Sequence, residues 1–192
     1  EIEINKKEYE VKVPVPGIHN IYNALASIAA GVELMIPEED IIKGIEEFSP
    51  AKMRLDIINS NGIKVINDAY NASPQSMEAA LVVLKEVSSG QRSIAVLGDM
   101  YELGEMTEEA HIHIGKFAAE QGIDYIIAVG DNAKSICKGA LSMGVDKERV
   151  LKFENNKETS KFLGSFIKEG DVILVKGSRG MKMEEIVNKL TS

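Results

Sequence analysis

The sequence predicts an α/β fold with a mostly parallel sheet in its C-terminal two thirds. Short apolar stretches alternate there with segments of helical period, and the stretches are rich in Val, Ile and Leu, as strands buried on both faces are. Such alternation favours a doubly wound, Rossmann-like sheet with helices on both faces. The predicted parallel strands are "KVIND" (64–68), "SIAVLG" (93–98), "YIIAVG" (125–130), "RVLKF" (149–153) and "VILVKG" (172–177).

The N-terminal elements have a different pattern. Residues 1–13 alternate apolar and polar around Asn5-Lys6-Lys7, which predicts a β-hairpin. A helix is expected in 17–35, and a second one starts at Pro37, because proline suits the first helical turn. The Ser- and Pro-containing "FSPAKM" (48–53) is the predicted linker, so the expected domains are 1–50 and 51–192.

One antiparallel strand is expected at the edge of the sheet. "RLDIINSNGIKVIND" (54–68) reads as two strands separated by Asn61-Gly62, the strongest short signal for a hairpin.

Composition limits the function. The 192 residues are 44% hydrophobic and 27% charged, with a net charge of −8, so neither nucleic-acid binding nor membrane insertion is expected. A single cysteine, Cys137, fits a reducing, cytoplasmic location. The chain begins at Glu1, without Met, inside a strand pattern, so we expect it to be a piece of a longer protein.

Polar clusters follow four of the five predicted parallel strands, and ligands of such sheets bind beyond the carboxyl ends of the strands. The clusters are "NDAYN" (67–71), "GDMYELGE" (98–105), "GDN" (130–132) and "KGSRGMK" (176–182). They predict a ligand site at this edge.

In the first cluster, helix capping by Ser73 and Pro74 explains those two residues alone. It leaves Asp68, Tyr70 and Asn71 unexplained. An acid at a strand end can accept the hydroxyls of a ribose.

Two further clusters have alternative interpretations. Asp99, Glu102 and Glu105 are able to hold Mg²⁺, but a glycine-hinged loop near a substrate is preferred. The cluster with Lys176, Ser178 and Arg179 (176–182) suits a carboxylate or phosphate, or is a solvated basic turn.

Other signals are structural or missing. Neither a P-loop nor a G-x-G-x-x-G motif occurs. His111 and His113 lie two apart and do not share a helix face, so they and Cys137 are interpreted as structural or surface residues, and no metal ligand is assigned.

Two amides in the first predicted helix are a candidate for ligand binding. Asn20 and Asn23 share a helix face, beside His19, and amides can bind an adenine edge.

Three motifs together resemble the Mur ligase family, ATP-dependent amide-forming enzymes of peptidoglycan assembly. "GIHNIYNALASIAAG" (17–31) resembles the family's H-N-x-x-N helix, "MRLD" (53–56) its arginine motif, and "DAYNASP" (68–74) the start of its C-terminal domain. The resemblance implies that 1–50 are the end of the central ATPase domain and 51–192 the C-terminal domain.

The resemblance also implies site residues. Asn23, with Asn20 and His19, would face adenine, and Asp68 would hold the ribose. Arg54 would reach across the interdomain cleft to the γ-phosphate of ATP and the acyl-phosphate. The remaining residues with implied roles are Tyr70 and Asn71, which would line the same cleft, and Lys176, Ser178 and Arg179, near the incoming D-alanyl-D-alanine.

"DAYNASP", "GDMYELGE" and "KGSRGMKME" most resemble the members that join D-alanyl-D-alanine to UDP-N-acetylmuramoyl-tripeptide. Their reaction uses ATP and Mg²⁺. The P-loop, the Mg²⁺ ligands and a modified lysine of the family would lie in the missing N-terminal domains, so this chain alone is expected to be inactive.

Two alternatives stay open. In the first, the chain is part of another family member, which adds diaminopimelate or lysine to the peptide or glutamate to folate. In the second, it is a non-catalytic Rossmann-like module that binds a nucleotide or a protein partner.

Overall fold

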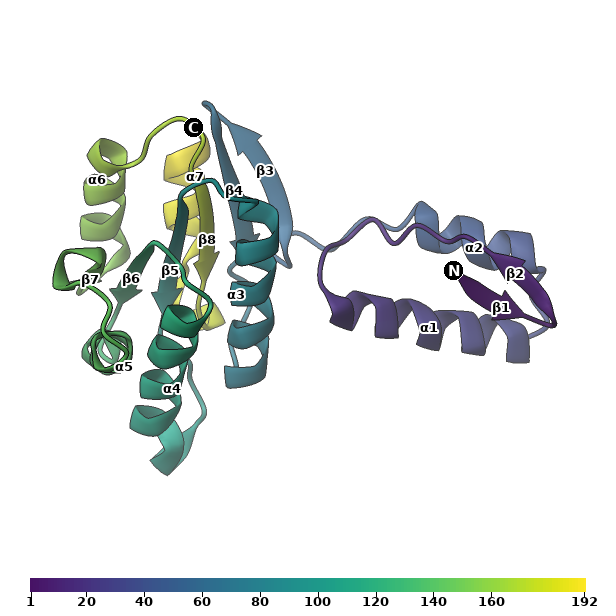
Figure 1. Ribbon diagram of the computed structural model, residues 1–192, viewed down its shortest axis with the longest axis horizontal. Coiled ribbons are helices and arrows are strands. Elements are labelled where there is room, and N and C mark those ends of the chain that lie inside the picture. The colour runs from purple at the N-terminus through teal and green to yellow at the C-terminus, as the bar shows by residue number, and fades with distance from the viewer. The chain divides into compact units, whose positions relative to one another are not determined.

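The computed structural model describes residues 1–192, which form two compact units, Glu1–Ala51 and Lys52–Ser192. In the first unit, strands β1 (Ile2–Ile4) and β2 (Lys7–Tyr9) form an antiparallel hairpin, and helices α1 (Ile18–Glu33) and α2 (Glu38–Glu46) follow (Figure 1). The predicted hairpin and helix pair are confirmed. The second helix begins one residue later than predicted, with Pro37 at its N-cap.

The core of the first unit is small, and much of α1 is apolar and exposed. Four isoleucines are buried there: Ile4, Ile28, Ile41 and Ile45. Glu38, at the start of α2, accepts hydrogen bonds from Asn5, Lys7 and Tyr9 of the hairpin. Large apolar side chains remain exposed on α1 or just after it, namely Ile18, Ile21, Tyr22, Leu25, Leu34 and Met35.

The second unit is built on a six-stranded sheet in the order β3-β4-β8-β5-β6-β7. Only β3 runs antiparallel, at the edge, and it pairs with β4 through the Asn61-Gly62 turn. The predicted mostly parallel sheet is therefore confirmed. Its strands are β3 (Asp56–Ser60), β4 (Ile63–Asp68), β5 (Ser93–Gly98), β6 (Tyr125–Val129), β7 (Val150–Phe153) and β8 (Val172–Lys176).

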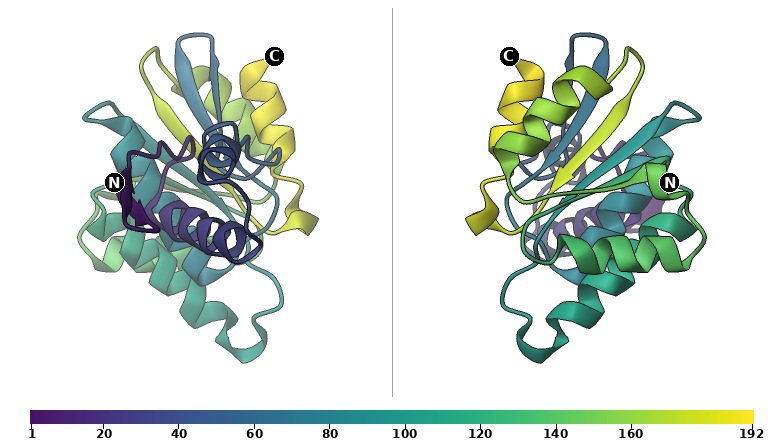
Figure 2. Two further views of the ribbon diagram at one scale, coloured as in Figure 1. Left: turned by 90° about the vertical axis from the view of Figure 1, so that its right-hand side faces the viewer. Right: turned by 90° about the vertical axis from the view of Figure 1, so that its left-hand side faces the viewer.

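Helices cover both faces of this sheet (Figures 1 and 2). One layer contains α3 (Pro74–Ser88), α4 (Thr107–Glu120) and α5 (Ala133–Ser142). The other contains α6 (Asn156–Phe166) and α7 (Glu184–Thr191). Three short 3₁₀ helices complete the unit: η1 (Gly104–Met106), η2 (Lys147–Arg149) and η3 (Arg179–Met181).

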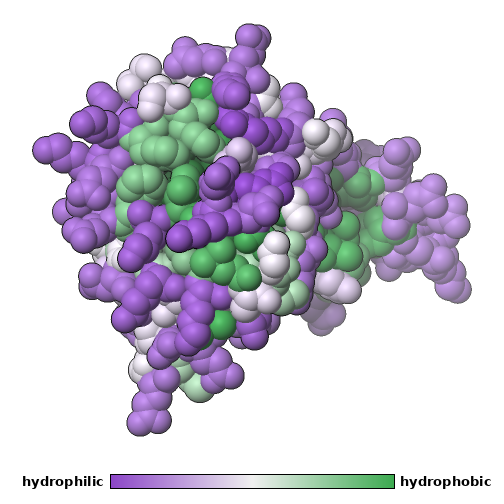
Figure 3. Space-filling view, turned by 60° about the vertical axis from the view of Figure 1, so that its left-hand side comes forward, coloured by the Kyte–Doolittle hydropathy of each residue, from purple (hydrophilic) through white to green (hydrophobic).

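Each central strand contributes to two separate cores. In β4, Val65 packs with the α6–α7 layer and Ile66 with the α3–α5 layer, because successive side chains point to opposite faces. All six residues of β5 are buried. Burial on both faces is the physical reason why these strands are nearly continuous apolar runs. On the face drawn in Figure 3, hydrophilic side chains surround smaller hydrophobic areas.

Helices α4 and α5 approach each other unusually closely. A Cβ atom on Gly115 of α4 would lie 1.9 Å from the carbonyl oxygen of Ile136, and one on Gly139 of α5 would lie 2.0 Å from that of Ile112. Two glycines thus let the two helix backbones touch.

Every helix of the structure is either too short or too polar to span a membrane.

Cys137 of α5 is buried, which should slow its reaction with thiol reagents. Burial is the main cause that raises the pKa of its thiol, so less thiolate is present near pH 8. We expect a disulfide reagent to label the native chain at least about tenfold more slowly than the urea-unfolded chain. Absorbance of the released thiol gives both rates, and equal rates would contradict the burial of Cys137.

Candidate functional site at the carboxyl edge of the sheet

The carboxyl ends of β4, β8 and β5 are neighbours, so three of the polar clusters meet at one edge. Asp68 of β4 pairs in register with Lys176 of β8, which pairs in turn with Leu97 of β5. The chain leaves β5 towards α4 on one face and leaves β8 towards α7 on the other. Such a switch point is where ligands of open α/β sheets bind.

Asp68 and Lys176 form a buried ion pair at this edge. The Lys176 Nζ lies 2.5 Å from Asp68 Oδ2 and 2.9 Å from the carbonyl oxygen of Asn71. Lys176 is only 3% exposed, so the predicted alternative of a solvated basic turn is wrong for this residue. The second carboxylate oxygen, Asp68 Oδ1, accepts the backbone N–H of Leu55 at 3.1 Å.

Arg54 stands beside this pair on the segment that enters β3. Its guanidinium carbon lies 4.2 Å from the centroid of the Tyr70 ring, a cation–π contact. The backbone N–H of Tyr70 donates to the carbonyl oxygen of Met53 at 3.1 Å. Arg54 is exposed and takes part in none of the ion pairs of the structure, so its charge is free to meet an anion.

The corner after β4 passes directly into α3. Ser73 accepts the backbone N–H of Ser76 and Pro74 occupies the first helical turn, which confirms the predicted capping roles of Ser73 and Pro74. The side chain of Asn67 accepts the N–H of Ala69 and is buried. Asn71 is exposed, and its carbonyl accepts from Lys176.

The loops after β5 and β8 are joined by hydrogen bonds. Buried Ser178 donates its N–H to the carbonyl oxygen of Asp99 at 2.9 Å, and its Oγ accepts the N–H of Tyr101 at 2.8 Å. The Asp99 carboxylate accepts the N–H groups of Asp131 and Asn132 in the loop after β6. Burial, then the charges of Asp99 and Asp131, raise the pKa of Tyr101.

Other members of these clusters face solvent or stabilise the fold. Arg179 is exposed and pairs with Glu184 at 2.7 Å. His111 is fully buried and accepts the N–H of Met100 at 2.9 Å, whereas exposed His113 pairs with Glu78. The prediction that these histidines are structural or surface residues is confirmed, with His111 in the core and His113 on the surface. No group of three or more His, Cys, Asp or Glu side chains converges to hold a metal ion.

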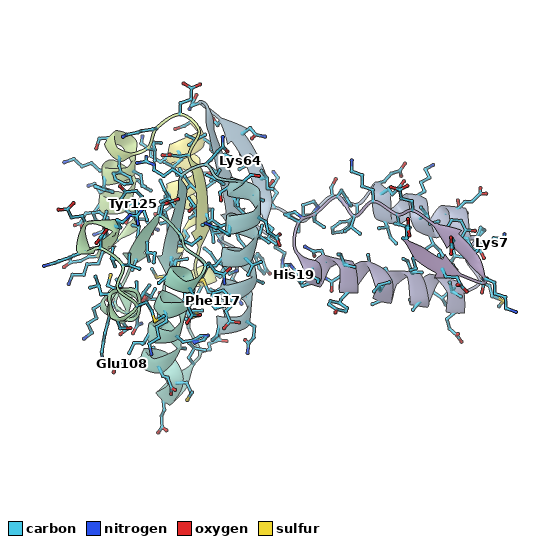
Figure 4. All side chains as sticks on the ribbon, in the orientation of Figure 1. Lys7, His19, Lys64, Glu108, Phe117 and Tyr125 are labelled. Atoms are coloured by element: carbon cyan, nitrogen blue, oxygen red, sulfur yellow. The ribbon has the colours of Figure 1, made fainter.

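In the first unit, the predicted amides lie at the start of α1, where Figure 4 labels His19. Asn20 donates to the carbonyl oxygen of Pro16 at 2.7 Å, and Asn23 donates to Asn20 Oδ1 at 3.3 Å. Asn20 also contacts the His19 ring at 3.2 Å. Both amides line a hollow of about 340 Å³ whose other walls are mainly apolar.

The structure therefore brings some of the predicted site residues together within the second unit. Arg54, Asp68, Tyr70, Asn71 and Lys176 form one cluster, which we call the β4 corner. Ser178 and Arg179 belong to the adjoining loop after β8, and His19, Asn20 and Asn23 belong to the other unit.

Sequence reasoning missed one group of the site, the N–H of Leu55, which binds Asp68. It did single out Asp99, but as a possible metal ligand or part of a loop near a substrate, and not as the carboxylate that organises the loop after β6.

A larger hollow lies at the same carboxyl edge of the sheet as the β4 corner, but at the ends of β6 and β7. It measures about 790 Å³ and is lined by residues at the end of β7 and in the segments that follow β6 and β7, among them Lys134 and Lys152. A third, of about 420 Å³, lies around the β3–β4 turn and Asp171, at the opposite edge of the sheet. None of these three hollows is lined by Arg54 or Asp68.

The parallel sheet and the polar corner at its switch point define a Rossmann-like α/β domain of the ligand-binding class. Residues 53–179 match the family described as "Mur ligase, glutamate ligase domain". The chain belongs to the Mur ligase family.

Individual relatives share most of this chain. The UDP-N-acetylmuramoyl-tripeptide–D-alanyl-D-alanine ligase of Bacillus subtilis is 40% identical over 93% of the chain, and that of Escherichia coli is 36% identical over 94%. A crystal structure of MurF from Acinetobacter baumannii, 34% identical, covers 94% of the chain with a TM-score of 0.83. MurF from Thermotoga maritima in complex with ADP covers 92% at 23% identity, with a TM-score of 0.77, and shows the same fold.

The chain is shorter than these relatives. It spans 39% of the B. subtilis and E. coli proteins and 39% of each of the two MurF chains.

Proposed function

We propose that this chain is the C-terminal part of an ATP-dependent ligase that joins D-alanyl-D-alanine to UDP-N-acetylmuramoyl-tripeptide. The observation that carries the proposal is the 40% identity, over 93% of the chain, to a ligase of that name. The exposed Arg54 of the β4 corner supports it, because an unpaired cation suits a phosphorylated ligand.

The first unit supplies the adenine subsite in this proposal. Asn20 and Asn23 offer amide donors and acceptors at the wall of a mainly apolar hollow, which matches the flat apolar faces and polar edge of adenine. His19 contacts Asn20 and so orients its amide.

The same unit is assigned to the end of a central ATP-binding domain. Its own core contains four buried isoleucines, while Ile18, Tyr22 and Leu34 are 68%, 66% and 71% exposed. We expect this apolar surface to pack against the N-terminal part of the longer protein, since large exposed apolar patches usually mark interfaces.

The second unit supplies the ribose and phosphate contacts. Asp68 keeps lone pairs for ribose hydroxyls besides its bonds to Lys176 and Leu55, since each carboxylate oxygen accepts two hydrogen bonds. Tyr70 and Asn71 line the same corner. Ser178 and Arg179, in the loop after β8, are assigned to the incoming D-alanyl-D-alanine, whose carboxylate suits an exposed guanidinium.

Arg54 acts in the chemical step of the proposed reaction. The tripeptide carboxylate attacks the γ-phosphorus of ATP and ADP leaves, and the dipeptide amine then displaces phosphate from the acyl-phosphate. Negative charge on the phosphoryl oxygens must be stabilised during the first transfer. An arginine carries a permanent charge and a fork of donors that matches phosphate geometry.

Mg²⁺ enters the proposal only through the family. The second unit presents single carboxylates such as Glu102 and Glu105, which are exposed, but no converging set of three. No residue of this chain is assigned as a Mg²⁺ ligand. A cytoplasmic location is part of the same proposal.

A substrate comparison with the full-length protein tests the proposed function. Phosphate release should be fastest with UDP-N-acetylmuramoyl-tripeptide and D-alanyl-D-alanine, and at least about a hundredfold slower with diaminopimelate, lysine or glutamate, because a site built for a given polar group rejects analogues that lack it. The isolated 192-residue chain should release none. A preference for another amine would overturn the assigned substrate, and no turnover with any of them would support a binding module.

A further inference from the structure

The segment that carries Arg54 is tied to the β4 corner at both of its ends. The carbonyl oxygen of Met53 accepts the N–H of Tyr70, and the N–H of Leu55 donates to Asp68 Oδ1. One hydrogen bond thus fixes the residue before Arg54 and one fixes the residue after it. The guanidinium itself rests on the Tyr70 ring.

This segment is held in an unfavourable backbone conformation. Met53 has a φ of 64° and Leu55 a φ of 48°, in the left-handed region that residues with a Cβ atom avoid. Such conformations persist only where surrounding contacts impose them. The two hydrogen bonds to the β4 corner are contacts of this kind.

Lys176 holds the acceptor of one of those bonds. Its Nζ binds Asp68 Oδ2 and the carbonyl oxygen of Asn71, so it fixes the carboxylate and the backbone of the corner together. The ammonium reaches them from β8, in direct register with Asp68, and is 3% exposed. Two of its three donors are used inside the protein, which leaves little of it for a substrate.

We propose that Lys176 is a positioning residue that acts through Asp68 to hold Arg54 in place. The path runs from Lys176 Nζ to the Asp68 carboxylate, to the N–H of Leu55, and to the backbone that carries Arg54. This assignment replaces contact with the incoming dipeptide as the role of Lys176. Its catalytic consequence rests on the proposed function, whereas the tether itself does not.

Amide hydrogen exchange in the 192-residue chain tests the tether without any activity. In Lys176→Met, exchange at Leu55 and Tyr70 should become at least about tenfold faster, because the Asp68 carboxylate is no longer fixed. The amides of Ile66 and Leu174, inside β4 and β8, should stay protected. Lys152→Met, the same change at an exposed residue of β7, is the control and should alter neither tether amide.

A second variant covers the case that Lys176→Met does not fold, since it leaves a buried carboxylate unpaired. Lys176→Gln keeps an NH₂ donor group, although without the charge, and should give a smaller acceleration at the same two amides. Unchanged exchange at Leu55 and Tyr70 in whichever variant keeps β4 and β8 protected would overturn the proposal. Exposure of the whole sheet in both variants would also overturn it, because Lys176 would then serve the entire fold.

Kinetics of the full-length enzyme test the consequence for Arg54. Lys176→Met should lower kcat at least about tenfold with little change in the KM for D-alanyl-D-alanine. In an Arg54→Ala background the same substitution should cost less than about twofold, because both changes remove one function. Independent, multiplying effects, or a raised KM for the dipeptide with kcat unchanged, would overturn the positioning role. No turnover by the unaltered enzyme would instead refute the proposed function and leave the exchange result standing.

Discussion

Arg54→Ala in the full-length protein should lower kcat about 10²- to 10³-fold, the usual cost of removing one preorganised group that stabilises transition-state charge. Arg54 has no carboxylate partner in the structure, and its guanidinium is exposed above Tyr70. Its charge is therefore available to the phosphoryl oxygens during transfer. Initial rates of ADP formation with saturating substrates measure the effect.

The control for Arg54 is Arg149→Ala. Arg149 is also exposed, but it lies in η2 and pairs with Asp124 at 3.5 Å, away from the β4 corner. This variant should keep kcat within about twofold, because exposed ion pairs contribute little. Arg54→Lys should recover only part of the rate, since a lysine lacks the planar fork of donors. Near-normal turnover by Arg54→Ala would refute the catalytic role.

Gly115→Ala should destabilise the second unit by about 3 kcal/mol, the upper end of the usual cost of overpacking. The new methyl group would lie 1.9 Å from the carbonyl oxygen of Ile136 and 2.8 Å from its carbonyl carbon. Both atoms belong to the backbone of α5, so a side-chain rotation cannot relieve the clash. The two helices must separate, which also opens their contact at Gly139.

Urea unfolding followed by circular dichroism measures this loss, and Gly164→Ala is its matched control. Gly164 lies inside α6, is exposed, and has no atom within 4 Å of the position of an added Cβ. Alanine should stabilise that helix by about 0.5–1 kcal/mol through its better helix propensity. If both variants unfolded at the same urea concentration, the close approach of α4 and α5 would not exist in solution.

The sequence determined the elements of this protein and the places where polar residues leave the sheet. Apolar runs gave the strands, Asn61-Gly62 gave the edge hairpin, and Ser73 with Pro74 gave the start of α3. These features depend on residues close together in the chain, whose periodicity and backbone preferences are legible one segment at a time. The sequence also predicted that the polar residues after these strands lie at one edge of the sheet, because the carboxyl ends of parallel strands share an edge.

Only the tertiary structure decided which of those exits meet. Lys176 and Asp68 are 108 positions apart, and their pairing depends on β8 inserting between β4 and β5. Nothing local distinguishes a lysine that will be buried there from a solvated one such as Lys182. Strand order and register arise from the packing of both helix layers on the sheet, which no single segment encodes. Because of that packing, Lys176 is buried and binds Asp68 in the β4 corner, although its sequence context is also typical of a solvated basic turn.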